Sequence, residues 1–172
     1  MQQAHNIYLT KFQQQSLYMG AKDERVIAAR RVGKTDGRRV LVTEDNRWPW
    51  YWTIGGRVRF GETAEAAILR EIYEELGVHA EIDRLYSIAQ KFFTVESTVY
   101  HELEFLFLIK PFDISKIDYS AIHCDDENLR LVWLDTAEKP DKQVYPKNLF
   151  SAVQNPSAKL TFLCEDELHT QK

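Results

Sequence analysis

The sequence predicts an α/β domain built around a mixed β-sheet. One observation is the hydrophobic run at residues 103–109, which is typical of a central strand covered on both faces. A second is an apolar stripe that repeats every four residues through Ala64–Leu76, the spacing of one helix face. A third is that strand-like segments both precede and follow this helix, an order that favours an α/β arrangement.

Before the helix, two β-rich segments occur at residues 25–31 and 40–43, and the pair Asp36-Gly37 between them predicts a hairpin turn. An aromatic cluster at residues 48–52 follows and leads into a double glycine. The helix then begins after Glu62 and is expected to end at Gly77.

Beyond the helix, strands are predicted at residues 82–93, 99–109, 129–134 and 160–164. Pro146 is expected at the first position of a second helix, because proline is favoured there. No repeat or interdomain linker interrupts this pattern. We therefore expect one domain over residues 23–172, preceded by a Gln-rich extension over residues 1–22.

Composition limits the class of protein. The chain has 172 residues, of which 44% are hydrophobic and 28% charged, as in an ordinary globular domain. The net charge of −4 argues against general nucleic-acid binding. No apolar run is long enough for a membrane span, and the first residues do not resemble a secretory signal. Cys124 and Cys164 have no metal-binding spacing and indicate free thiols in the cytoplasm.

Three glutamates share one face near the end of the predicted helix. Glu71, Glu74 and Glu75 stand at positions i, i+3 and i+4, so their carboxylates are neighbours. They repel one another and lie at the negative end of the helix dipole, where an anion costs about 0.3–1 kcal/mol. One interpretation is a solvated acidic face. The other is a site for a divalent cation, and all-oxygen ligands favour Mg²⁺, Mn²⁺ or Ca²⁺.

The loop before the helix supports the second interpretation. Residues 55–62 read GGRVRFGE, and the three glycines let the backbone approach a ligand closely. A Gly-Gly pair alone is typical of an ordinary turn. Next to a carboxylate-rich helix, however, it indicates a place where a metal and a phosphate meet.

The spacing of these residues resembles a known family motif. Gly56, Glu62 after five intervening residues, and then the run from Arg70 after seven more match the Nudix box at every defined position. That run is Arg70-Glu71-Ile72-Tyr73-Glu74-Glu75-Leu76-Gly77-Val78. The resemblance covers about residues 24–155. The family commonly has proline where this chain has Ile54, a difference that removes no ligand.

The resemblance implies a Nudix α/β/α sandwich around a mixed sheet, in which the box forms a loop–helix–loop. It implies that the three helix glutamates bind divalent metal, with the Gly55 carbonyl as a further ligand. It also implies an ion pair between Glu62 and Arg70 that holds the loop against the helix. The position of Glu62 at the helix N-terminus is electrostatically favourable in its own right.

The resemblance further implies hydrolysis of a nucleoside diphosphate linked to another group, such as a nucleoside triphosphate or a nucleotide sugar. Mg²⁺ (or Mn²⁺) would screen the pyrophosphate and acidify a bound water, and a carboxylate base would orient that water for attack at phosphorus. The candidate catalytic residues are Glu74, Glu75, Arg70 and Glu62.

Two alternatives to this enzyme remain at the level of sequence. One is a non-catalytic Nudix-fold module that binds a nucleotide or nucleotide sugar. The other is an allylic-diphosphate isomerase of related fold, which expects a catalytic cysteine; both cysteines of this chain lie well past the box, in no supporting motif.

Candidates for substrate contact come from cations and aromatics near the box. Arg57, Arg59 and Arg30 could hold phosphates, and Trp50 could stack on a base, although each is also an ordinary surface or core residue type. The expected partner is a small nucleotide-type pyrophosphate, with neither nucleic acid nor membrane.

Glu104 is the candidate for a fourth metal-binding carboxylate. It lies in the apolar strand segment, where a glutamate is costly unless it is paired or binds metal, and the alternative is a solvated strand end. The acidic loop Asp125-Asp126-Glu127 could supply a base or form a solvated turn.

Residues 1–22 could form a hairpin, an arm on a partner subunit or a loosely held tail. Because many members of the family dimerise, the resemblance implies a possible homodimer.

Overall fold

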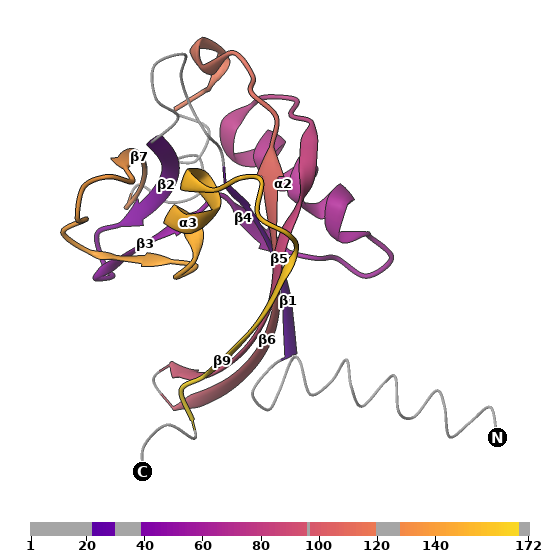
Figure 1. The fold of residues 1–172 in the computed structure, drawn as a ribbon, viewed down its shortest axis with the longest axis vertical. Coiled ribbons are helices and arrows are strands. Elements are labelled where there is room, and N and C mark those ends of the chain that lie inside the picture. The colour runs from indigo at the N-terminus through magenta and orange to yellow at the C-terminus, as the bar shows by residue number, and fades with distance from the viewer. Residues whose placement is uncertain (1–21, 30–38, 96, 120–127, 169–172) are drawn as a thin grey trace.

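Two mixed β-sheets form the centre of the protein (Figure 1). The computed structural model describes residues 22–29, 39–95, 97–119 and 128–168. The five-stranded sheet has the order β4-β1-β6-β5-β9, and the four-stranded sheet has the order β7-β2-β3-β8. The strands are β1 Lys22–Ala29, β2 Arg39–Asp45, β3 Trp50–Thr53, β4 Gly55–Arg57, β5 Ile82–Val95, β6 Thr98–Ile109, β7 Leu129–Asp135, β8 Gln143–Tyr145 and β9 Thr161–Asp166.

The predicted mixed sheet is confirmed by the pairing of the strands. β1 pairs parallel with β6, β5 with β9 and β3 with β8, whereas the other ladders are antiparallel. β6 lies in the middle of the five-stranded sheet, as its apolar run predicts.

In the part of the chain that the structure describes, the α-helices are α2 (Ala64–Leu76) and α3 (Leu149–Gln154), and they pack against different core clusters. Alternation along β6 separates the clusters: Phe107 and Ile109 pack with α2, whereas Leu106 and Leu108 pack with α3. The two helices therefore lie against opposite faces of the sheet that contains β6, which is the α/β/α order that the resemblance implies.

The boundaries of α2 agree with the prediction. Its first turn is capped by Thr63, whose hydroxyl accepts a hydrogen bond from the Ala66 N–H. Its end is set by Gly77 in the left-handed conformation at φ 67°, whose N–H donates to the Tyr73 carbonyl. Both caps hold the glutamate-bearing turns of the helix in place against the core.

Two expectations about local structure were wrong. The segments predicted as a hairpin lie in different sheets, because β1 pairs with β4 and β6 while β2 pairs with β3 and β7. Pro146 is not at the first helical position: α3 begins at Leu149, whose N–H donates to the Pro146 carbonyl in a preceding turn. A short 3₁₀ helix, η1 (Ile114–Lys116), follows β6. None of the helices in the described residues is long and apolar enough to cross a membrane.

Candidate metal and phosphate site

The double glycine after β3 makes room for a carboxylate of α2. A Cβ atom placed on Gly56 would lie 2.3 Å from Glu71 Oε1, closer than two such atoms can approach. Glycine is therefore needed at this position so that the Glu71 side chain can lie against the backbone of β4. The loop that contains Gly56 and the helix α2 are therefore in direct contact at Glu71.

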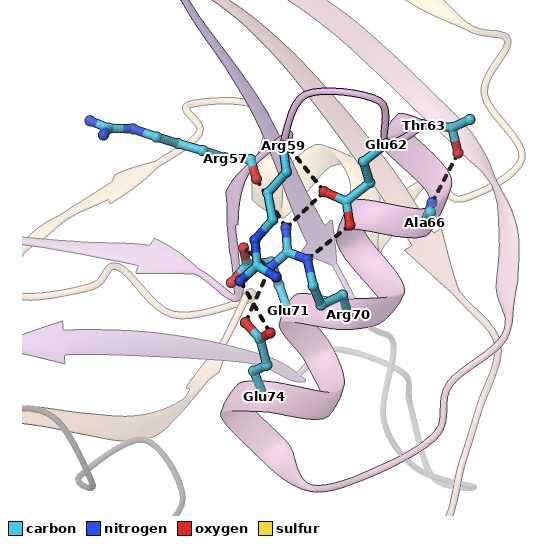
Figure 2. A network of polar contacts seen from close by, with 8 residues as sticks. All are labelled: Arg57, Arg59, Glu62, Thr63, Ala66, Arg70, Glu71 and Glu74. Atoms are coloured by element: carbon cyan, nitrogen blue, oxygen red, sulfur yellow. Dashed lines mark hydrogen bonds and ion pairs between the residues drawn. The ribbon is translucent and has the colours of Figure 1, made fainter. Parts of the chain in front are cut away.

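Glu62 fastens the loop to the helix through Arg70 (Figure 2). Arg70 Nε donates to Glu62 Oε1 at 2.8 Å, and a second guanidinium nitrogen donates to Glu62 Oε2 at 3.0 Å. The backbone N–H of Arg59 also donates to Glu62, at 3.0 Å. The Arg70 hydrogen bonds, followed by that of Arg59, lower the pKa of Glu62 to about 2. The resemblance implied this pair from sequence.

Arg70 reaches more carboxylates than the helix spacing alone indicates. Besides Glu62, it donates to Glu71 Oε1 at 2.5 Å and to Glu74 Oε2 at 3.1 Å, and it also binds the Arg57 carbonyl. These pairings raise the pKa of Arg70 further above its usual range. One guanidinium therefore neutralises much of the repulsion on this helix face in the metal-free protein.

A second arginine adds to this compensation. Arg59 approaches Glu74 at 3.3 Å, with side-chain exposures of 64% and 46%. Both groups are open to water, so the pair contributes at most about 1 kcal/mol. Figure 2 shows that the Arg57 side chain instead points away from this network.

Glu75 differs from the other two glutamates because one of its carboxylate oxygens is buried and no arginine pairs with it in the ion pairs of the described residues. Its Oε2 atom has no hydrogen-bond partner, and its pKa is raised to about 8. Burial is the largest cause, the charges of Glu71 and Glu74 add to it, and a hydrogen bond from the Gly55 N–H opposes it. A carboxylate in this state is stabilised by any cation that binds next to it.

The three helix glutamates have the chemistry of a divalent-metal site. All three offer hard oxygen atoms, and Glu75 has an unused one turned into the protein. In the described part of the chain, no three acidic, histidine or cysteine side chains already converge as a metal site. The side chains of Glu71 and Glu74 are turned to Arg70 instead. The donor set thus fits a divalent cation.

The structure does not bring Glu104 together with the helix glutamates. Lys91 Nζ lies 2.5 Å from Glu104 Oε2 and 3.9 Å from Glu102. Glu104 is two residues from Leu106 on β6, so it shares the face that packs toward α3 rather than α2. A buried lysine, which sequence spacing did not reveal, provides the pairing that a buried glutamate needs. The role of Glu104 as a metal ligand stays a prediction.

The other predicted substrate residues are scattered. Trp50 stacks on Trp48 with ring centroids 5.1 Å apart and meets Tyr145 edge-on at 6.3 Å, in the four-stranded sheet. This packing accounts for its half-buried state without a ligand. Arg30, the acidic loop 125–127 and Cys124 lie outside the described residues. Cys164 is exposed on β9.

Two contacts in the site were missed by sequence reasoning. The first is the close approach of Glu71 to Gly56, for which the double glycine was the available signal. The second is the contact between Arg59 and Glu74, which depends on how the loop folds back over the helix and has no signal in the spacing.

The fold and this loop–helix constellation define a class of protein. The family model of the NUDIX domain matches residues 22–151. The chain therefore belongs to the Nudix family.

Individual relatives agree with that family. The chain is 31% identical over 105 residues to the Nucleoside diphosphate-linked moiety X motif 6 protein of Xenopus laevis, covering 60% of this chain and 46% of the relative. It thus spans about half the length of that protein. A MutT protein from Bacillus halodurans has the same fold, with a TM-score of 0.62, 19% identity and coverage of 81% and 86% of the two chains. A Nudix hydrolase from Nitrosomonas europaea also has this fold, with a TM-score of 0.59 and 16% identity. The match covers 87% of this chain and 81% of the Nitrosomonas chain.

Proposed function

We propose that this protein hydrolyses a pyrophosphate bond in a nucleoside diphosphate linked to another group, by water attack at phosphorus and with Mg²⁺ or Mn²⁺ as cofactor. The observation that carries the proposal is the Glu75 carboxylate beside Glu71 and Glu74, because its Oε2 atom is buried and has no hydrogen-bond partner. Such an arrangement costs stability in the metal-free protein, and a divalent cation would remove that cost.

Glu71, Glu74 and Glu75, with the Gly55 carbonyl, would hold the metal. When bound, the metal would neutralise the pyrophosphate and lower the pKa of a coordinated water. Glu74 is the most exposed of the three carboxylates that pair with Arg70, at 46%, and is suited to accept a proton from water. Glu62 and Arg70 position the loop, so they act through its geometry rather than on the substrate.

Arg59 and Arg57 are suited to bind the phosphates of the substrate. Both are exposed in the box loop, and Arg59 already lies beside a metal-binding candidate, Glu74. Guanidinium groups bind phosphate oxygens with two parallel hydrogen bonds. Base stacking by Trp50 and phosphate binding by Arg30 are part of the same proposal.

Names of similar structures indicate substrates for a first assay. A UDP-X diphosphatase gives a TM-score of 0.53 at 16% identity, and an ADP-ribose pyrophosphatase from Streptococcus suis gives 0.54 at 12%. At these identities the likeness supports the fold alone. We therefore propose a nucleotide-type pyrophosphate without choosing among nucleoside triphosphates, nucleotide sugars and dinucleotides.

The test is phosphate or nucleotide release from a panel of these substrates with Mg²⁺ and with Mn²⁺. We expect turnover of at least one substrate, its loss with EDTA, and a decrease of orders of magnitude in Glu75→Gln. Tight nucleotide binding without turnover across the panel would instead support a non-catalytic binding module. Undiminished activity of a Cys124→Ala, Cys164→Ala double variant would exclude the cysteine-dependent isomerase.

The proposal also covers the domain boundaries, the localisation and the oligomeric state of the protein. We propose that residues 23–172 form the catalytic domain, that residues 1–22 are an extension, and that the protein is cytoplasmic and homodimeric. The presence of only two cysteines, in no disulfide-like pattern, supports a reducing compartment.

A further inference from the structure

β9 leaves one edge of the five-stranded sheet without a partner strand among the residues that the structure describes. On its other side it pairs with β5, and the Glu167 N–H continues this ladder to the Phe92 carbonyl at 2.8 Å. Backbone groups alternate in direction along a strand, so those of Phe162 and Cys164 point away from β5. An open edge of this kind is a template for a further strand.

The exposed edge is also apolar. Phe162 is 72% exposed and Leu160, just before the strand, is 44% exposed. The first four residues of β9, TFLC, contain neither a charged residue nor proline, the residues that commonly protect an edge strand, and the charges of β9 stand only at its end. Figure 1 shows that β9 runs with β5 and β6 into the part of the sheet that extends past both helices.

The charges flanking β9 favour a second copy of the same strand. Lys159 precedes the strand, whereas Glu165, Asp166 and then Glu167 stand at its end. Lys147 pairs with Glu165 at 3.6 Å and with Glu167 at 2.8 Å, so one cation faces three acidic side chains and this end keeps a net negative charge. In an antiparallel pair of β9 strands, the basic start of each copy lies near the acidic end of the other. A parallel pair would place the acidic ends side by side, which is unfavourable.

We propose that β9 pairs antiparallel with β9 of a second copy across a two-fold axis, which joins the two five-stranded sheets into one continuous sheet. In this arrangement the outward backbone groups of Phe162 and Cys164 gain hydrogen-bond partners, and the exposed Phe162 rings pack at the interface. This inference names the interface of the homodimer proposed above and does not depend on hydrolysis.

The test is sedimentation velocity of the full chain from about 1 to about 200 µM, a range suited to a small interface. We expect a concentration-dependent monomer–dimer equilibrium. Phe162→Glu should raise the dimer Kd by about 100-fold or more, because each dimer loses two apolar contacts and gains two buried charges. Cys164→Pro should do the same by removing an outward N–H while leaving the ladder to β5 intact.

Two matched controls keep the result specific. Phe60→Glu makes the same exchange at a side chain that is 94% exposed in the box loop, and Cys164→Ser keeps the backbone N–H. Both should dimerise as the wild type does. A wild-type chain that is monomeric throughout the range would overturn the proposal, and so would a dimer that persists in Phe162→Glu. If Cys164→Pro fails to fold, Phe162→Glu decides alone, since its side chain is exposed in the monomer.

Discussion

Glu75 offers the sharpest test of the metal-site reasoning, because its substitution should stabilise the metal-free protein. Its pKa is raised from 4.5 to about 8, chiefly by burial. Glu75→Gln keeps the size and helix propensity of the side chain but removes the charge.

The magnitude follows from proton linkage. A shift from 4.5 to about 8 corresponds to roughly 5 kcal/mol at 1.36 kcal/mol per pKa unit, and relaxation of the site should reduce this to about 1–3 kcal/mol. Because the folded protein binds the proton more tightly than the unfolded chain, wild-type stability falls as the pH rises from about 4.5 to about 8. The advantage of the variant should therefore be largest above pH 8 and vanish near pH 4.5.

The assay is urea unfolding with EDTA at about pH 5 and about pH 8.5, at equal ionic strength. Glu74→Gln is the matched control, since Glu74 is 46% exposed and its loss should change the free energy of unfolding by less than about 1 kcal/mol at either pH. With Mg²⁺ or Mn²⁺ the wild type should become the more stable of the two proteins. The metal should raise the wild-type Tm and raise that of Glu75→Gln much less. A Glu75→Gln protein that is less stable than wild type at pH 8.5 without metal would refute the reasoning.

Three further substitutions test the rest of the site. Glu62→Gln should lower both Tm and activity. Because the pKa of Glu62 is lowered from 4.5 to about 2, the stabilisation that this carboxylate provides is complete above about pH 4.5 and is lost as the pH falls toward 2. The difference in Tm between wild type and variant, measured over a pH series, should decrease over that range. Gly56→Ala should weaken Mn²⁺ binding in titration calorimetry, since its Cβ would displace the carboxylate of Glu71; unchanged affinity would contradict the role given to this glycine. Arg59→Ala should tighten Mn²⁺ binding about 2- to 5-fold by removing a competitor for Glu74 while raising KM for the substrate, and Arg59→Lys should be intermediate.

Much of the fold was predictable because it depends on local patterns. The spacing of apolar residues through Ala64–Leu76 determines a helix with one buried face. Gly77 ends this helix by its own left-handed conformation, which does not depend on the tertiary contacts of the helix. The continuous apolar run of β6 likewise predicts a strand covered on both sides. The box spacing places three glutamates on one face by helix geometry alone.

Strand pairing was not predictable in the same way. The Asp36-Gly37 pair is a local hairpin signal, yet β1 pairs with β6, which is distant in the sequence. Such pairing is decided by which apolar faces can be buried together, a property of the whole chain rather than of a turn. The same holds for the edge of β9 that no described strand pairs with, since the strand order places β9 at the end of its sheet.

The sequence by itself determined which residue types meet at the site, because a motif fixes their spacing along one loop and one helix. Only the tertiary structure decided their electrostatic states. Glu74 and Glu75 are neighbours in sequence, but one reaches solvent beside two arginines while the other is buried with an unpartnered oxygen. Glu104, in turn, is bound by Lys91 from the adjacent strand. Burial and the distance to opposite charges set the pKa of a carboxylate, and both arise from contacts between segments that the spacing of residues does not encode.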